Sequence, residues 1–212
     1  MAKKKPKTTR LVLLVEGPTD VRFFERLIDD VFSEGGTCLT RGEIRIASCE
    51  GINRLEKKGI SKVRREMKEG KISPPDVVVA VCYDTDQSGI CYHPPFDEAN
   101  VRRELKKIGI EESIFCAADA TIEDWIMLDT DNVLAHLKLP ASTKLNGSTG
   151  LEKLKKLYRK QRKAYTKQQK DTENLIDRLD MRKIRECLRK DPRTGIAALE
   201  EFIRTGKIKK KR

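Results

Sequence analysis

Short apolar runs alternate with helix-periodic segments along the first two-thirds of the chain. The runs predict strands at about residues 10–16, 43–49, 76–83 and 113–117. Between them, apolar residues recur at helical spacing on one face, as Phe24, Leu27, Ile28 and Val31 do after Pro18. Further helices are predicted at about 52–69, 97–108 and 121–128. Strands that alternate with helices predict an α/β fold, with a mostly parallel sheet flanked by helices and joined by right-handed crossovers.

The composition changes after Pro140. Residues 142–150 resemble a linker, and residues 151–170 contain nine Lys or Arg residues against one acid, Glu152. Two shorter helical stretches, at about 181–190 and 194–204, follow. We therefore expect four segments: a basic N-terminal tail (1–9), an α/β domain (10–140), a basic helical C-terminal extension packed against the sheet (141–205), and a basic tail (206–212).

Positive charge makes nucleic acid the first partner to consider. The formal net charge is +12, and charged residues make up 37% of the chain. The expected contacts to the nucleic-acid backbone are Lys155, Lys156, Arg159, Lys160, Arg162 and Lys163. The alternative is that these residues form a solvated helix face, and that the terminal lysines are only solubilising tails. Aromatic residues make up only 5% of the chain, which disfavours recognition of single-stranded bases by stacking.

The cysteines and the apolar runs indicate a reducing, aqueous compartment. The six cysteines include no Cys-x-x-Cys pair, so we expect reduced thiols that pack as small apolar groups, and no structural zinc. No apolar run approaches the roughly 20 residues that span a bilayer. The run that begins at Leu11 is interrupted by Glu16 and does not reach signal-peptide length. The expectation is a cytoplasmic protein without a membrane partner.

Acidic residues stand where two of the predicted strands end. Glu16 follows the first strand, and Asp84 and Asp86 follow the strand at 76–83. Sites form at the carboxyl ends of parallel strands, so these residues are expected to converge although nearly seventy residues separate them. Carboxylates packed together repel one another and usually need a divalent cation. Each has a plainer explanation, because an acid often ends a buried strand and Gln87-Ser88-Gly89 favours a turn.

Two helix starts supply further candidates. Asp20 falls in the first turn after Pro18, where it either interacts with the helix dipole or reaches the same cation as Glu16. In residues 121–128 the apolar stripe turns Glu123 inward and Asp124 towards solvent. Asp124 also forms a capping box with Thr121 in the sequence pattern.

Several common chemistries lack their sequence signals. The chain contains no Gly-x-x-x-x-Gly-Lys-Ser/Thr loop, no Gly-x-Gly-x-x-Gly and no Gly-x-Ser-x-Gly. His93 and His136 have no acid or nucleophile at a recognisable spacing, and we expect ordinary roles for both. Nucleotide hydrolysis by a P-loop, dinucleotide redox chemistry and serine hydrolysis are therefore disfavoured.

Taken together, the motifs resemble the TOPRIM domain. The order Glu16-Gly17-x-x-Asp20, a strand leading to Gly51, and Asp84-x-Asp86-x-x-Gly89 is similar to that domain, a Rossmann-like fold found in topoisomerases, primases and nucleases. The form Val-Glu-Gly-x-Thr-Asp, with Glu123-Asp-Trp125 and Tyr165-Thr-Lys167, most resembles the small standalone members of the OLD (overcoming lysogenization defect) nucleases.

The resemblance implies Mg²⁺-dependent cleavage of phosphodiester bonds in DNA or RNA, with Mn²⁺ as a substitute. It implies one metal held by Glu16 and Asp20, and a second held by Asp84 and Asp86 with help from Glu123. Lys167 would neutralise charge on the phosphate, and the catalytic set would be Glu16, Asp84, Asp86 and Lys167. Phage defence or nucleic-acid processing would be the setting. Two alternatives remain: a nuclease that matures structured RNA, and a TOPRIM subunit that acts only with a partner such as a separately encoded ATPase.

Overall fold

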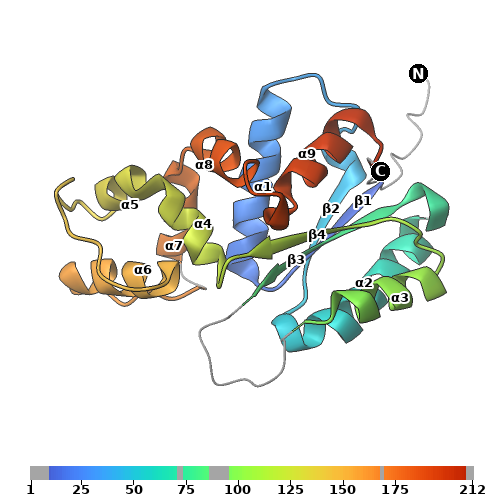
Figure 1. Cartoon of the computed structure of the whole chain (residues 1–212), viewed down its shortest axis with the longest axis horizontal. Helices are drawn as coiled ribbons and strands as arrows, with labels where there is room; N and C mark the ends of the chain where they lie inside the picture. The colour runs from blue at the N-terminus through green and yellow to red at the C-terminus, as the bar shows by residue number, and fades with distance from the viewer. Residues whose placement is uncertain (1–9, 71–73, 86–95, 168–169, 209–212) are drawn as a thin grey trace.

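A four-stranded parallel sheet forms the centre of the protein. The computed structural model describes residues 10–70, 74–85, 96–167 and 170–208. The strands lie in the order β2-β1-β3-β4, and all three neighbouring pairs are parallel (Figure 1). Their bounds are β1 Leu11–Val15, β2 Ile44–Ser48, β3 Val78–Asp84 and β4 Ser113–Ala118. The predicted α/β fold with a parallel sheet is thereby confirmed.

The inner strands are apolar throughout because both of their faces are covered. All five residues of β1 are buried, and Leu13 pairs with Ile46 on one side and Ala80 on the other. Alternate residues of β1 belong to two separate cores, since successive side chains of a strand point to opposite faces. This arrangement explains why the strands appear in the sequence as continuous apolar runs.

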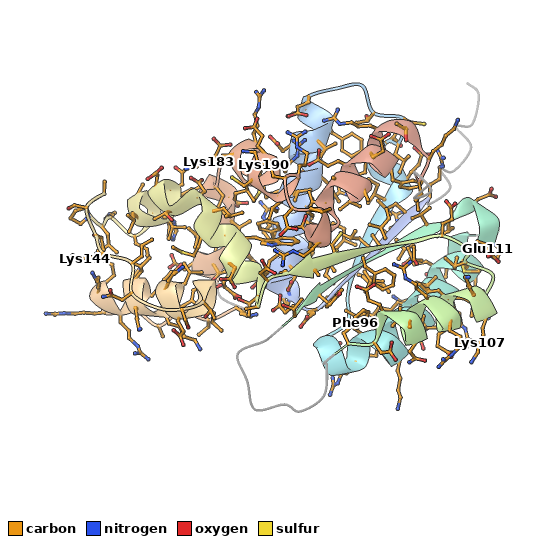
Figure 2. The ribbon with its side chains drawn as sticks, viewed as in Figure 1. Phe96, Lys107, Glu111, Lys144, Lys183 and Lys190 are labelled. Atoms are coloured by element: carbon orange, nitrogen blue, oxygen red, sulfur yellow. The ribbon has the colours of Figure 1, made fainter. Side chains whose placement is uncertain are left out.

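Helices cover both faces of the sheet. One core joins the sheet to α1 (Pro18–Ser33), α8 (Met181–Leu188) and α9 (Ile196–Thr205). The other core joins it to α2 (Ile52–Gly70) and α3 (Glu98–Lys107), on the opposite side in Figure 1. Phe96, labelled in Figure 2, stacks there on Tyr83 with ring centroids 4.4 Å apart.

The remaining helices gather beyond the end towards which the strands point (Figure 1). They are α4 (Ile122–Ile126), α5 (Thr130–His136), α6 (Gly150–Lys160) and α7 (Lys170–Arg178). α6 contacts α4, and α7 contacts both α1 and α5. The sequence pattern did not predict α5 or α7 as separate helices. Within the described ranges, no helix combines the length and the apolar character that crossing a bilayer would need.

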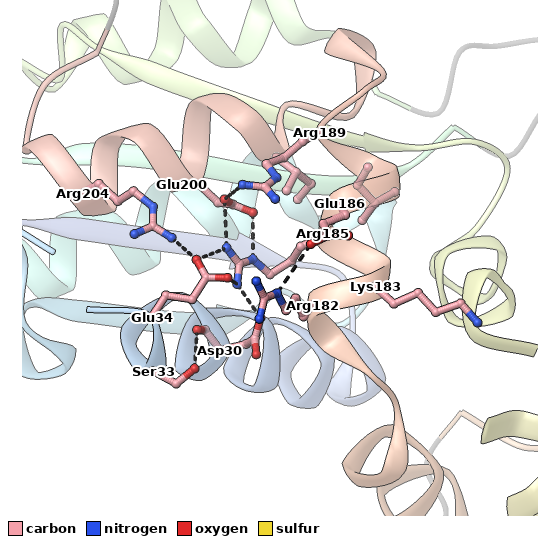
Figure 3. A network of polar contacts seen from close by, with 12 residues as sticks. Asp30, Ser33, Glu34, Arg182, Lys183, Arg185, Glu186, Arg189, Glu200 and Arg204 are labelled. Carbon is pink, nitrogen blue, oxygen red and sulfur yellow. Dashed lines mark hydrogen bonds and ion pairs between the residues drawn. The ribbon is translucent and has the colours of Figure 1, made fainter. Parts of the chain in front are cut away.

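A buried arginine ties the last two helices to the first. Arg185 of α8 is fully buried, and its guanidinium contacts Asp30 of α1, Glu34 just after α1, and Glu200 of α9 (Figure 3). Nε of Arg185 donates to Glu200 Oε1 at 2.9 Å. The turn before α9 also lies tightly on the sheet, because Gly195 has a φ of +68° and a Cβ there would meet the Phe115 carbonyl oxygen at 1.9 Å. Of the expected C-terminal extension, α9 therefore packs against the sheet and α8 against α1, whereas α6 and α7 contact other helices.

Candidate active site

The acidic residues gather at the carboxyl ends of β1 and β3. These two strands are neighbours, but the chain leaves them in opposite directions across the sheet, first to β2 and later to β4. Such a reversal leaves a crevice at the strand ends. Glu16 and Asp84 lie there together, and the backbone N–H of Asp84 donates to Glu16 Oε1 at 2.6 Å. The topology thus brings the two strand ends into direct contact.

Asp20 joins this group from the first turn of α1. Its side chain is buried, and its Oδ2 accepts a hydrogen bond from the backbone N–H of Gly17 at 3.1 Å. Asp20 is therefore both a helix-capping residue and a member of the acidic cluster, so the two interpretations left open by the sequence are compatible. Next to it, the hydroxyl of Thr19 donates to the backbone carbonyl of Lys167.

Glu123 enters the cluster from the first turn of α4. Its side chain is 0% exposed, and its Oε1 accepts a hydrogen bond from the hydroxyl of Tyr165 at 3.0 Å. Its Oε2 is buried and accepts no hydrogen bond from any part of the chain that is described. The predicted inward position of Glu123 agrees with this geometry.

Asp124 differs from the expectation. It is half-buried rather than solvated, because its Oδ1 accepts a hydrogen bond from the backbone N–H of Gly150 at 2.6 Å. Its Oδ2 accepts from the N–H of Thr121, so the predicted capping contact is present. Asp124 therefore links the start of α4 to the start of α6, a contact that no local pattern reveals.

Lys167 lies among these carboxylates. Its Nζ is 3.4 Å from Asp84 Oδ2 and 3.3 Å from Glu123 Oε2. The other oxygen of Asp84, Oδ1, accepts the N–H of Ile122 at 2.8 Å. The side chain of Lys167 is 41% exposed, whereas the two acids that it contacts are almost completely buried. One ammonium group therefore faces a buried group of acids from the solvent side.

Among the described residues, the positive charge that contacts this cluster comes from Lys167. The pKa of Asp84 is raised to about 8, chiefly by burial and also by the neighbouring carboxylates of Glu16, Asp20 and Glu123, against the opposing effect of Lys167. Burial likewise raises the pKa of Asp20 to about 6. Burial lowers the pKa of Lys167, but the surrounding carboxylates outweigh that effect and leave it raised. Lys167 therefore stays charged, while the raised pKa values of Asp20 and Asp84 show that these two acids ionise with difficulty.

An open cavity of about 350 Å³ adjoins the acids. Glu16, Asp20 and Lys167 line it, together with Glu50 and Gly51 from the turn after β2. Glu50 has a φ of +61° and Gly51 a φ of +110°, so this turn places two successive residues in the left-handed region. Glu50 was not among the predicted site residues. The sequence feature that could have indicated Glu50 is the adjacent Gly51, which marks a turn shortly after the second strand.

The carboxylates of this site are suitable ligands for a hard divalent cation. Among the described residues, however, they are not close enough together to form a complete metal-binding site. Carboxylate oxygens are the ligands that Mg²⁺ prefers, and Glu16, Asp20, Asp84 and Glu123 supply them. The buried Oε2 of Glu123 makes only an ion pair to Lys167 at 3.3 Å, and the pKa values of Asp20 and Asp84 are raised, so these oxygens could accept a cation. No three His, Cys, Asp or Glu side chains within the described ranges are preassembled as a metal-binding group. Asp86, the remaining predicted ligand, lies outside the described residues.

The predicted nucleic-acid contacts lie on α6 and just after it. All six side chains are exposed: Lys155, Lys156, Arg159, Lys160, Arg162 and Lys163. The opposite side of α6 is buried through Leu154, Leu157 and Tyr158. The chain runs from this basic face through Tyr165 to Lys167, so α6 leads directly into the acidic cluster.

Comparison with known proteins leaves the family open. No family model matches the chain, and no match was found among curated proteins. One similar solved structure is the C-terminal region of the OLD protein from Xanthomonas campestris pv. campestris. The two share 18% sequence identity over 93% of each chain, with a TM-score of 0.36. The function must therefore be inferred from the geometry of this chain.

Proposed function

We propose that the protein is a Mg²⁺-dependent nuclease of the TOPRIM type, which hydrolyses phosphodiester bonds of DNA or RNA. The observation that carries this proposal is a group of buried acids at the carboxyl ends of parallel strands, beside an open cavity. Buried acids without enough positive charge are costly to a folded protein. Their retention beside a cavity favours a role in binding a cation and a substrate.

Glu16, Asp20, Asp84 and Glu123 would hold the metal, together with Asp86. When bound, Mg²⁺ stabilises charge on a phosphoryl group and lowers the pKa of a water molecule, which is the chemistry that phosphodiester hydrolysis needs. The predicted division into two metals is part of the proposal. Mn²⁺ is expected to replace Mg²⁺.

Residues around the acids would keep them in position. The hydroxyl of Tyr165 fixes one oxygen of Glu123, and the carboxylate of Glu16 holds the backbone N–H of Asp84. Lys167 would meet the phosphate from the open side of the cluster, where its positive charge opposes the developing negative charge. These contacts orient the acids before a substrate arrives.

The basic face of α6 would bind the backbone of the nucleic acid. Exposed Lys and Arg side chains contact phosphates without reading the sequence, so the affinity should fall steeply as salt increases. Replacing Lys155 and Arg159 by Glu should weaken binding and reduce its salt dependence. The same change on α3, at exposed Lys106 and Arg103, is the matched control and should have little effect.

Cleavage of labelled DNA and RNA in Mg²⁺ tests the proposal. Asp84→Ala and Glu16→Ala should abolish cleavage and leave nucleic-acid affinity similar or higher, because they remove ligands of the cation and also remove negative charge. Asp119→Ala, an exposed acid at the same edge of the sheet, should remain active. Equal cleavage in excess chelator would exclude the metal mechanism. If the isolated protein does not cleave nucleic acid but does so when a partner protein is added, the partner-activated alternative is supported instead.

A further inference from the structure

Lys167 occupies the place between the acids that a divalent cation would need. We propose that Lys167 is a displaceable counter-ion, which neutralises Asp84 and Glu123 until a divalent cation enters and drives its ammonium group towards the adjoining cavity. There the ammonium group would meet the substrate phosphate. This inference rests on the proposed function and adds the prediction that the lysine and the metal compete for the same oxygens.

The contacts of Lys167 suit a temporary partner. Its Nζ lies 3.4 Å from Asp84 and 3.3 Å from Glu123, longer than the roughly 2.7–2.9 Å of a strong charge-assisted hydrogen bond. Arg185 shows the contrast in the same protein. Its guanidinium is 0% exposed and donates to both oxygens of Glu200, at 2.9 and 3.1 Å. Arg185 is therefore a permanent structural cation, while Lys167 is held more loosely.

The backbone of Lys167 is anchored although its side chain is not. The Thr19 hydroxyl donates to the Lys167 carbonyl, so α1 holds the peptide beside the cluster. The side chain is 41% exposed and lines the cavity of about 350 Å³ that it shares with Glu16 and Asp20. Rotation of the side chain alone would carry the ammonium group into this open space.

The balance of charge favours replacement of the Lys167 ammonium group by a divalent cation. Among the described residues, one ammonium group faces Asp20, Asp84 and Glu123, and its 3.3 Å ion pair to Glu123 Oε2 is not a well-aligned hydrogen bond. A divalent cation brings twice the charge to the same oxygens. Because the lysine must leave first, its presence should weaken cation binding to the protein that lacks substrate.

Mn²⁺ binding to the full-length protein, measured by calorimetry without nucleic acid, tests the competition. Lys167→Met keeps the length of the side chain and removes its charge, and should bind Mn²⁺ about tenfold more tightly than the wild type. Lys190→Met is the control, an exposed lysine after α8 and outside the predicted nucleic-acid contacts, and should bind as the wild type does.

Lys167→Arg provides a test in the opposite direction that keeps the charge needed for folding. A guanidinium group binds carboxylates through two parallel hydrogen bonds, so it should hold the acids more firmly and weaken Mn²⁺ binding. If the wild type binds Mn²⁺ while Lys167→Met binds no more tightly, or Lys167→Arg no more weakly, the inference is wrong and the proposed function stands. If none of the proteins binds Mn²⁺, both fail together.

Discussion

Replacing Asp84 by Asn should stabilise the metal-free protein at pH 8 while abolishing its proposed activity. In the folded protein the pKa of Asp84 is about 8, against an ordinary value of 3.8. Between these two values the folded state holds a proton that the unfolded state has released, so stability falls as the pH rises from about 4 to about 8. Each pH unit is worth about 1.4 kcal/mol, which sets an upper limit of about 6 kcal/mol for this loss.

The Asn side chain removes the charge and keeps the useful contact. Its carbonyl oxygen can still accept the Ile122 N–H, now 2.8 Å from Asp84 Oδ1. The lost contact to Lys167 is screened by solvent and worth about 1 kcal/mol or less. We expect a net gain of about 2–4 kcal/mol at pH 8, or about 5–10 °C in Tm, that shrinks below about 1 kcal/mol near pH 5.

Urea and thermal unfolding in excess chelator, at pH 5 and pH 8, measure this difference. Asp119→Asn is the control, because its side chain is 73% exposed at the same edge of the sheet, and it should change stability by less than about 0.5 kcal/mol. An Asp84→Asn protein that is no more stable than the wild type at pH 8, or a gain that does not depend on pH, would refute the reasoning.

Further substitutions test the supports of the site. Tyr165→Phe should cost about 1–3 kcal/mol in urea unfolding, because it leaves Glu123 Oε1 buried without its donor, and should slow cleavage. Arg185→Ala should cost about 3–5 kcal/mol by the same measurement, since it leaves the buried Glu200 with the longer 3.6 Å contact to Arg189; a loss below about 1 kcal/mol would contradict this. Gly150→Ala should destabilise the link between α4 and α6, because its Cβ would lie 2.4 Å from the backbone N of Asp124. A Gly150→Ala protein with near-wild-type thermal stability would contradict this prediction, because it would show that the backbone at Asp124 can move to accommodate the Cβ.

The parts of the site that sequence alone predicts are those fixed by strand order. Glu16 and Asp84 each end a continuous apolar run, and parallel strands place such ends at one edge. Glu123 follows from the apolar stripe of its own helix, which leaves only one of two adjacent acids facing inward. These residues are predictable because local periodicity determines where each side chain points.

The parts that sequence reasoning missed depend on long-range packing. The helix α7 is short and amphipathic among charged residues, and it is defined by its contacts to α1 and α5. No acid stands at a recognisable spacing from His136 in the sequence, and the fold places its Nε2 3.4 Å from Asp171 Oδ1, thirty-five residues along the chain. The resemblance had selected Lys167 from the basic stretch, and the fold places that ammonium group beside Asp84 and Glu123, while Lys163 contacts Asp171.

Anomalous diffraction from a crystal soaked in Mn²⁺ tests the central idea most directly, because it locates the ion without any substrate or partner. We expect a Mn²⁺ peak among Glu16, Asp20 and Asp84, with the Lys167 ammonium moved away from Glu123. A protein that takes up no Mn²⁺ at this edge of the sheet, and keeps Lys167 between the two acids, would contradict it.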